Sequence, residues 1–313
     1  MSSSEHEEMA TSKTELESGY ASASSSSPSF PLVHLTPSHL TFLNNTLANL
    51  PPQDILKWAL LTVPNLYQTT ALGLSGLVTM DMLSKINLPN RKVPAIFLDT
   101  LHHFSETLDL LDSIKSHYPR LTIHVYKPLH CESADEFAAM HGPELWKTNE
   151  QLYDYVAKVE PAQRAYSELN VAAVLTGRRR SQGAARSSLP VIEIDEAGLL
   201  KLNPLANWSF SQVWAYIKEH DVPYNALVDR GYKSVGDWHS TEKVNDSDGE
   251  RGGRWKGREK TECGIHNPRS KYARFLREMQ MKESMEEGVR KRLEGVQLAQ
   301  SGSQEQPQET QQL

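Results

Sequence analysis

Cysteine, long apolar runs and an excess of positive charge are all missing or scarce in this 313-residue chain. Its two cysteines, Cys131 and Cys263, are too few for a disulfide scaffold or a four-cysteine zinc or iron–sulfur site. No stretch approaches the roughly 18 apolar residues of a membrane helix, and the N-terminus lacks the features of a signal peptide. The net charge of −6 argues against a nucleic-acid scaffold. We therefore expect a cytoplasmic protein with no membrane and no nucleic-acid partner.

The composition changes at both ends of the chain. Residues 1–34 are rich in Ser, Glu and Ala and poor in large apolar side chains, so we expect them to be disordered. We expect the same of most of the polar tail at 276–313. Between them the sequence predicts an α/β domain at 35–235. It is followed by a C-terminal segment at 236–275, rich in Gly, Asp and Arg, which carries Cys263.

The middle of the chain alternates short apolar runs with amphipathic helical patterns, which is typical of a mostly parallel sheet flanked by helices. The strand-like runs are residues 66–73, 93–99, 121–126 and 171–177, and the segments 191–195 and 200–205 come before the last long helix. The helical patterns are residues 38–50, 54–61, 78–86, 105–118, 161–169 and 210–220, and Pro223 is expected to begin a further short helix. Thr36 and Ser209 are the predicted N-caps of the first and last long helices.

Three loops follow strands of this predicted sheet, and ligands of such sheets bind beyond the carboxyl ends of the strands. The loops are residues 73–76, residues 99–100 and residues 177–183, and they should meet in one crevice. The first is Gly- and Ser-rich and leads into a helix, as in loops that bind phosphate. A simple tight turn between a strand and a helix would have the same sequence features. The loop is not a Walker motif, because no Lys-Ser or Lys-Thr follows its glycines.

Four arginines, Arg178, Arg179, Arg180 and Arg186, follow the strand at 171–177. Guanidinium groups bind phosphate and sulfate in a bidentate manner. A solvated surface cluster is the plain alternative. We favour anion binding because the cluster lies where ligands bind in this architecture.

Cys263 lies in a polar, cation-rich stretch that ends in the pentad Glu-Cys-Gly-Ile-His. Neighbouring cations favour the thiolate over the thiol and so raise the share of the nucleophilic form. Cys131 has no such neighbours, and we expect it to be inert. Because the sequence near Cys263 offers no second cysteine, release of an adduct on Cys263 would need an external thiol. His239 is a candidate ligand or acid–base residue, although a lone loop histidine is more often a bystander.

The motifs together resemble the fungal, thioredoxin-dependent phosphoadenylyl-sulfate (PAPS) reductases over residues 63–275. The strings that carry the resemblance are LDTLHHFSETLDLL, KVEPAQRAY, TGRRRSQGAARS, GYKSVGDWHST and GRWKGREKTECGIH. The resemblance implies an adenine nucleotide alpha hydrolase-like (PP-loop type) fold, a homodimer, and a mobile C-terminal segment that carries the nucleophile.

The resemblance also implies the chemistry. PAPS would be reduced to sulfite and adenosine 3′,5′-bisphosphate through an S-sulfocysteine on Cys263, in sulfate assimilation toward cysteine and methionine. No cofactor would be bound, and reduced thioredoxin or glutaredoxin would be the external electron donor. The implied substrate contacts are Thr70, Gly73, Ser75, Gly76, Asp99, Thr100, Arg178, Arg179, Arg180, Gln182, His239, Arg254, Lys256, Arg258 and His266.

Two departures from related patterns bear on this interpretation. The ATP pyrophosphatase loop reads Ser-Gly-Gly-x-Asp-Ser, whereas residues 75–80 read Ser-Gly-Leu-Val-Thr-Met, which weakens an ATP-hydrolysing role. Related reductases of adenylyl sulfate often carry paired cysteines for an iron–sulfur cluster, so two single cysteines favour PAPS. The alternatives left open are an adenylyl transferase of the ATP pyrophosphatase class and a non-enzymatic nucleotide sensor.

Overall fold

The computed structural model of the chain describes residues 35–88, 91–195, 198–245, 248–257, 260 and 262–266. Both predicted terminal extensions, residues 1–34 and 276–313, lie outside the described residues, as does the predicted substrate contact Arg258. In the part of the chain that is described, no helix has the length and apolar character needed to span a bilayer.

A six-stranded sheet forms the centre of the molecule, with strand order β3-β2-β1-β4-β6-β5. The strands are β1 (Leu66–Thr70), β2 (Ala95–Leu98), β3 (Ile123–Tyr126), β4 (Ala173–Leu175), β5 (Ile192–Ile194) and β6 (Leu200–Leu202). All neighbours pair in parallel except β5, which runs antiparallel to β6. The predicted mostly parallel sheet is confirmed.

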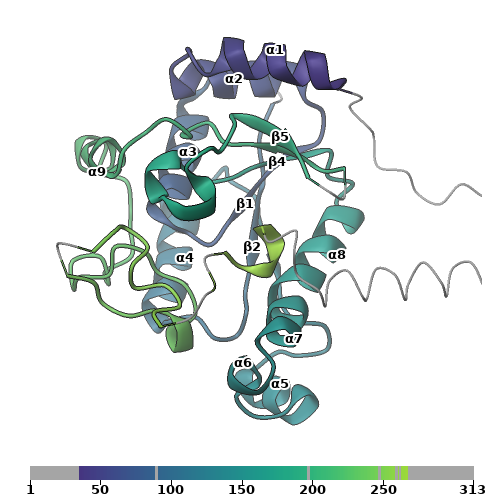
Figure 1. The fold of residues 1–313 in the computed structure, drawn as a ribbon, viewed down its shortest axis with the longest axis vertical. Coiled ribbons are helices and arrows are strands. Elements are labelled where there is room, and N and C mark those ends of the chain that lie inside the picture. The colour runs from purple at the N-terminus through teal and green to yellow at the C-terminus, as the bar shows by residue number, and fades with distance from the viewer. Residues whose placement is uncertain are drawn as a thin grey trace, which may run out of the picture.

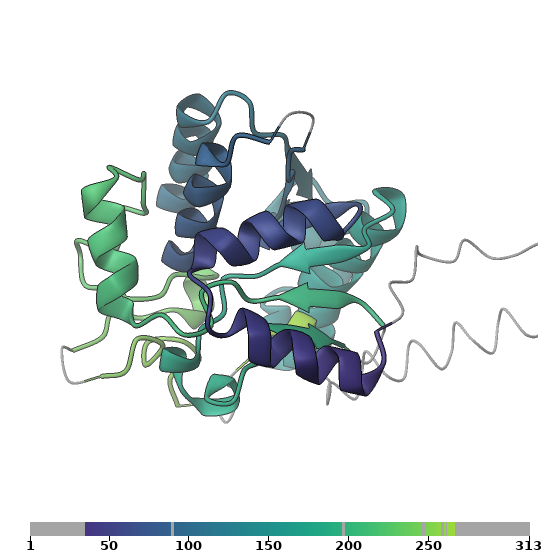
Figure 2. The ribbon, with the colours of Figure 1, turned by 90° about the horizontal axis from the view of Figure 1, so that it is seen from above.

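Helices cover both faces of the sheet (Figures 1 and 2). Six that the sequence predicts are α1 (Pro37–Leu47), α2 (Pro52–Thr62), α3 (Leu74–Lys85), α4 (Ser105–His117), α8 (Glu160–Glu168) and α9 (Phe210–Glu219). The predicted N-caps are confirmed, because Thr36 Oγ1 accepts the N–H of His39 and Ser209 Oγ accepts the N–H of Gln212.

The strands divide their side chains between two apolar interiors. Phe97 of β2 belongs to the larger interior, which α2, α3, α4 and α9 complete, whereas its neighbour Ile96 faces the α8 side. Both side chains are fully buried. Successive side chains of a strand point to opposite faces, so a strand buried on both faces is apolar at every position, as the sequence of β2 shows.

Residues between β3 and α8 form four helical elements, of which the sequence predicts only a helix after Cys131. They are α5 (Ala134–His141), α6 (Leu145–Thr148), α7 (Glu150–Asp154) and a π-helical turn, η1 (Tyr155–Val159). A third apolar cluster, which includes Phe137, Trp146, Tyr153 and Cys131, lies among them. Burial raises the pKa of the Cys131 thiol, in keeping with the predicted inert role.

The short helix expected at Pro223 is wrong, because residues 226–231 form turns. The side chain of Asn225 explains the difference: its Oδ1 accepts the N–H of Leu227 and its Nδ2 donates to Thr107 Oγ1. Such local bonds to the backbone compete with helix formation. Further along, the helical elements of the described residues are the short 3₁₀ turns η4 (Trp238–Ser240) and η5 (Gly264–His266), and Thr241 forms an isolated antiparallel bridge with Arg254.

Candidate active site

The crevice lies where β1 and β4 are neighbours. The chain leaves β1 for β2 and β3 on one side and returns to β4 on the other, which makes this the switch point of the sheet. The loops that follow the two strands touch: a Cβ added to Gly177 would lie 2.9 Å from the backbone nitrogen of Gly76. The predicted convergence of these two loops is confirmed. Gly73 is the N-cap of α3, and Ser75 and Gly76 lie in its first turn.

Arg179 is the most enclosed arginine beside the crevice, with a fully buried side chain. Its Nε donates to Ser75 Oγ at 2.7 Å, and its Nη1 donates to Ser181 Oγ and to the carbonyl of Trp208. Its Nη2 meets both carboxylate oxygens of Glu250 at 2.5 Å. Each of the three guanidinium nitrogens therefore has a protein acceptor.

The other arginines of the loop also have protein partners. Arg178 pairs with Glu193 of β5, and Arg180 donates to the carbonyl of Leu189 and to Asn207 Oδ1. In this structure Arg178 and Arg180 therefore bind nearby residues of the same chain. Their role as substrate contacts stays a prediction.

Arg186 reaches the segment that carries Cys263. Its Nη2 lies 2.6 Å from Glu262 Oε2, and its Nε donates to the other carboxylate oxygen. Its Nη1 donates to Gln182 Oε1. The arginine loop and the residue just before Cys263 are thus joined by a bidentate pair, which the sequence did not indicate.

Cys263 is partly exposed and comes directly before the turn η5. The N–H of Gly264 donates to Asp154 Oδ2 at 3.0 Å. A Cβ on Gly264 would lie 2.8 Å from Val159 Cγ2, so a glycine is needed for this close approach to η1. Ile265 packs against the apolar residues of the α8 face. The cysteine is therefore held on a turn that is docked against a π-helical turn, a feature often found at functional sites.

Lys158 of η1 is the site residue that the sequence analysis missed. Its Nζ lies 2.6 Å from Asp237 Oδ2 and 3.4 Å from Asp154 Oδ1, and all three side chains are buried. Burial alone would lower the pKa of Lys158, but the two carboxylates bring it above its ordinary value. Burial alone would likewise raise the pKa of Asp237, but the Lys158 charge brings it well below its ordinary value. Both groups stay charged at neutral pH.

Three cations surround Cys263 from two parts of the chain: Lys158, Arg251 and Arg254, each within electrostatic range of its sulfur. Burial lowers the pKa of Arg251 to about 10, which leaves this guanidinium charged at neutral pH. Arg254 donates to the carbonyl of Val235, and its Nε meets no acceptor among the described residues. Positive charge at this position attracts an anionic group toward the sulfur.

The second strand end is joined to the C-terminal segment. Thr100 Oγ1 donates to Asp237 Oδ1 at 2.7 Å, whereas Asp99 Oδ1 accepts the N–H of Leu101 within its own turn. His239 is stacked on Trp146, with ring centroids 4.3 Å apart, and its side chain is 4% exposed. The structure therefore places His239 inside an aromatic cluster beside Asp237.

The remaining predicted substrate contacts, Thr70, Lys256 and His266, differ in their burial and in their place in the fold. Thr70 Oγ1 accepts the N–H of Leu72 beneath the first loop. Lys256 is exposed and lies 3.9 Å from Glu242, and His266 ends η5. The substrate-binding roles of these residues stay predictions.

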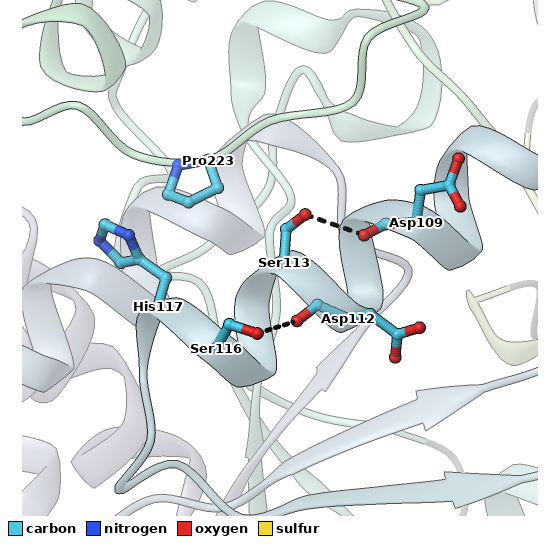
Figure 3. A pocket seen from close by; sticks show the side chains of 6 residues that line it. All are labelled: Asp109, Asp112, Ser113, Ser116, His117 and Pro223. Carbon is cyan, nitrogen blue, oxygen red and sulfur yellow. Dashed lines mark hydrogen bonds between the residues drawn. The ribbon is translucent and has the colours of Figure 1, made fainter.

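A surface hollow on α4 is separate from this site (Figure 3). Its lining residues are Asp109, Asp112, Ser113, Ser116, His117 and Pro223. The hydroxyls of Ser113 and Ser116 donate to carbonyls one turn earlier in the same helix. None of the predicted site residues lines this hollow, so the candidate active site is the crevice beside Cys263.

Comparison with known proteins gives consistent matches. Residues 65–243 match the model of the phosphoadenosine phosphosulfate reductase domain. The chain is 59% identical over 280 residues to a phosphoadenosine phosphosulfate reductase of Emericella nidulans, with 89% of this chain and 92% of that protein covered. It is 56% identical over 252 residues to a probable enzyme of the same name from Schizosaccharomyces pombe, with 80% and 93% covered.

A solved structure is also similar. The phosphoadenylyl-sulfate (PAPS) reductase of Candida auris, crystallised in complex with phosphate, is 55% identical. The match covers 67% of this chain and 100% of that chain, with a TM-score of 0.63. Family model, relatives and solved structure agree with the motifs and with the fold. The chain belongs to the phosphoadenosine phosphosulfate reductase family, and it is an oxidoreductase of sulfate assimilation.

Proposed function

We propose that the chain reduces PAPS to sulfite and adenosine 3′,5′-bisphosphate, with Cys263 as the nucleophile and thioredoxin or glutaredoxin as the electron donor. One observation carries the proposal: Cys263 is held on a docked turn among the cations Lys158, Arg251 and Arg254. Cations at this position stabilise the negative charge that develops on the departing phosphate.

The first step transfers the sulfonyl group. The Cys263 thiolate attacks the sulfur atom of PAPS and forms an S–S bond. The bond between this sulfur and the bridging phosphate oxygen breaks, and the electron pair leaves on adenosine 3′,5′-bisphosphate. The product on the enzyme is an S-sulfocysteine, and no proton needs to be supplied, because the leaving phosphate is a stable anion.

The second step supplies two electrons from an external dithiol. One carrier thiolate attacks the Cys263 sulfur and expels sulfite, which leaves a mixed disulfide. The second carrier thiolate then attacks the carrier sulfur of this disulfide and releases the Cys263 thiolate. The carrier ends as an internal disulfide. Cys131 cannot serve as the resolving thiol in this arrangement, because it is buried in the α5–α7 cluster.

In this proposal the nucleotide lies over the switch point of the sheet. The first turn of α3, with Ser75 and Gly76, offers backbone N–H groups and the positive end of a helix to the phosphosulfate. Thr100 and Asp99 lie at the neighbouring strand end, where the adenosine would be held. The partly exposed turn at Cys263 then has to face the nucleotide in one step and a protein carrier in the next.

Mass spectrometry of the reduced protein tests the proposal. The full chain is incubated with PAPS in the absence of a thiol carrier and digested. We expect one SO₃ group on the peptide that contains Cys263, and its loss with release of sulfite when reduced thioredoxin is added. A Cys131→Ser variant should behave as the unchanged protein, and a Cys263→Ser variant should form no adduct.

The same experiment separates the alternatives. An adduct that forms equally fast with adenylyl sulfate would show that the 3′-phosphate is not recognised and would make the chain a reductase of both nucleotides. If Cys263 stays unmodified and PAPS stays intact after thioredoxin is added, the reductase proposal is wrong. Release of pyrophosphate from ATP would then identify an adenylyl transferase of the ATP pyrophosphatase class.

A further inference from the structure

We propose that Glu250 is a positioning residue for this reaction: its ion pair with the buried Arg179 holds the segment that carries Cys263 over the nucleotide crevice. The inference rests on the function proposed above, and it changes the role of Arg179. The sequence assigns this arginine to the substrate, whereas the structure assigns it to the protein's own C-terminal segment.

Arg179 already has protein partners for its guanidinium group. The three nitrogens of this group contact Ser75 Oγ, Ser181 Oγ, the Trp208 carbonyl and the carboxylate of Glu250. The side chain is fully buried. A substrate anion could bind this guanidinium only by displacing a partner that is already in place.

Glu250 is equally well held. Its side chain is 9% exposed, and Oε1 accepts a second bond from Gln182 Nε2 at 3.1 Å. Gln182 Oε1 in turn accepts the backbone N–H of Arg179. A carboxylate enclosed by a guanidinium and an amide has a defined orientation, so the backbone at residue 250 has one position relative to the arginine loop.

The position of Glu250 determines what this contact can influence. Arg251 follows it directly and Arg254 lies four residues on, and both act electrostatically on Cys263. On the other side, Arg179 bonds Ser75 in the first turn of α3, where the phosphosulfate is proposed to lie. One ion pair therefore connects the phosphate-binding turn with the cations around the nucleophile.

A competing role for Glu250 predicts the opposite behaviour. In this competing role Glu250 is a stand-in that the nucleotide displaces, because a carboxylate on a buried arginine resembles a bound substrate anion. Its removal would then strengthen nucleotide binding and leave the reaction as fast or faster. A positioning residue behaves differently: its removal slows the reaction and leaves nucleotide affinity almost unchanged.

The test compares Glu250→Gln with Glu242→Gln in the full chain. Both lie in the C-terminal segment, but the Glu242 side chain is 65% exposed and lies 3.9 Å from Lys256. Three quantities are measured: the single-turnover rate of SO₃ transfer from PAPS, the affinity for adenosine 3′,5′-bisphosphate, and the rate of Cys263 alkylation by iodoacetamide, read from its peptide. The melting temperature shows that each variant is folded.

For Glu250→Gln we expect the transfer rate to fall by about 10²-fold, because a displacement of about 1 Å at the reacting atoms costs that much. Alkylation of Cys263 should rise severalfold, and nucleotide affinity should change by less than about threefold. Glu250→Asp keeps the charge on a shorter side chain and should recover part of the rate. Glu242→Gln should match the unchanged protein in all three measurements.

Two results would overturn the inference. One is an unchanged transfer rate in a folded Glu250→Gln protein, and the other is tighter nucleotide binding without a slower reaction. Failure of the proposed function looks different, because the unchanged protein would then form no adduct with PAPS. The alkylation rates of Glu250→Gln and the unchanged protein would still show whether Glu250 holds the segment.

Discussion

The α/β domain and the C-terminal segment are held together by different forces. The domain closes around two apolar interiors on the faces of its sheet. The segment also buries Trp255, packs Ile265 against the α8 face and stacks His239 on Trp146, and ion pairs join it to the domain. These pairs include Asp237 with Lys158, Glu250 with Arg179, Glu262 with Arg186, and Lys260 with Asp154.

Apolar burial suits the role of the domain as a scaffold, and ion pairs suit the role proposed for the C-terminal segment. Apolar burial is non-directional and stabilises a scaffold that stays closed. Buried ion pairs are sensitive to geometry, and both partners regain hydration when they separate, so their net contribution to stability is small while their effect on orientation is large. In the proposed reaction the segment covers a nucleotide and then presents its adduct to a carrier, which requires orientation and release more than permanent closure.

Removal of the buried Lys158 charge, which pairs with both Asp154 and Asp237, should have the largest effect. Lys158→Met leaves the buried carboxylates of Asp154 and Asp237 without their shared cation. We expect a loss of about 3–5 kcal/mol in the free energy of unfolding and the loss of SO₃ transfer to Cys263. Denaturant unfolding and the single-turnover assay measure the two quantities.

The exposed pair of Lys115 with Asp112 provides the control for that change. Lys115→Met should alter the unfolding free energy by only about 0–1 kcal/mol and leave transfer intact. Equal stability losses in the two lysine variants would contradict the view that Lys158 is the centre of a buried network.

A core substitution should separate stability from catalysis. Ile114 of α4 is fully buried in the larger interior, on the face opposite α8. Ile114→Ala should cost about 2–5 kcal/mol. Below its lowered melting temperature, its SO₃ transfer rate should stay within about twofold of the unchanged protein, because distant sites act independently. A large loss of rate in the folded protein would mean that the two regions are coupled.

A substitution at Gly264 should have the opposite outcome, a large loss of SO₃ transfer with a smaller loss of stability. A Cβ there would lie 2.8 Å from Val159 Cγ2 and 3.2 Å from Asp154 Cβ, so Gly264→Ala should push η5 away from η1. We expect a stability cost of about 1–3 kcal/mol and a fall in SO₃ transfer of about 10²-fold. Gly249→Ala is the matched control, since a Cβ there meets nothing within 4 Å. Similar rates for both alanine variants would show that η5 tolerates displacement.

The smallest expected effect is a pH dependence that originates at His102, next to the charged network. Burial lowers the pKa of His102 from 6.5; the Thr100 carbonyl and Asp237 oppose this, and Lys158 and His103 add to it. The unfolded chain therefore binds a proton at higher pH than the folded protein does. Stability from this group is complete above about pH 6.5 and is lost as the pH falls through the lowered pKa.

Melting temperatures at about pH 8 and about pH 5 measure this dependence, because histidine changes charge in that range. The His102→Asn variant, which keeps a donor for the Thr100 carbonyl, should lose less stability on acidification than the unchanged protein does. We expect a difference of a few degrees, since 1 kcal/mol moves the melting temperature of a domain this size by roughly 2–4 °C. An identical acid response in both proteins would assign the effect to other groups.

The sequence predicts the scaffold well and the site only in part. Strands such as β2 are identified by their apolar runs, and α1 and α9 by their N-caps, because these signals are local. Cys263 and the arginine loop stand out for the same reason. Lys158 does not, because its importance comes from Asp237, a residue far away in the chain. The elements that the sequence does not predict between β3 and α8 are α6, α7 and η1, which have only four or five residues each, so their formation depends on packing around Trp146 and its neighbours.

By itself, then, the sequence determines an α/β domain with a mostly parallel sheet, and it predicts where a ligand would bind and that Cys263 is the candidate nucleophile. Local periodicity, turn residues and charge are sufficient for these conclusions. The tertiary structure alone decides which charges meet. It turns Arg179 toward Glu250, puts Lys158 between two carboxylates, and seats Gly264 against η1. Contacts between residues far apart in sequence follow from how the elements pack, and no local pattern encodes that packing.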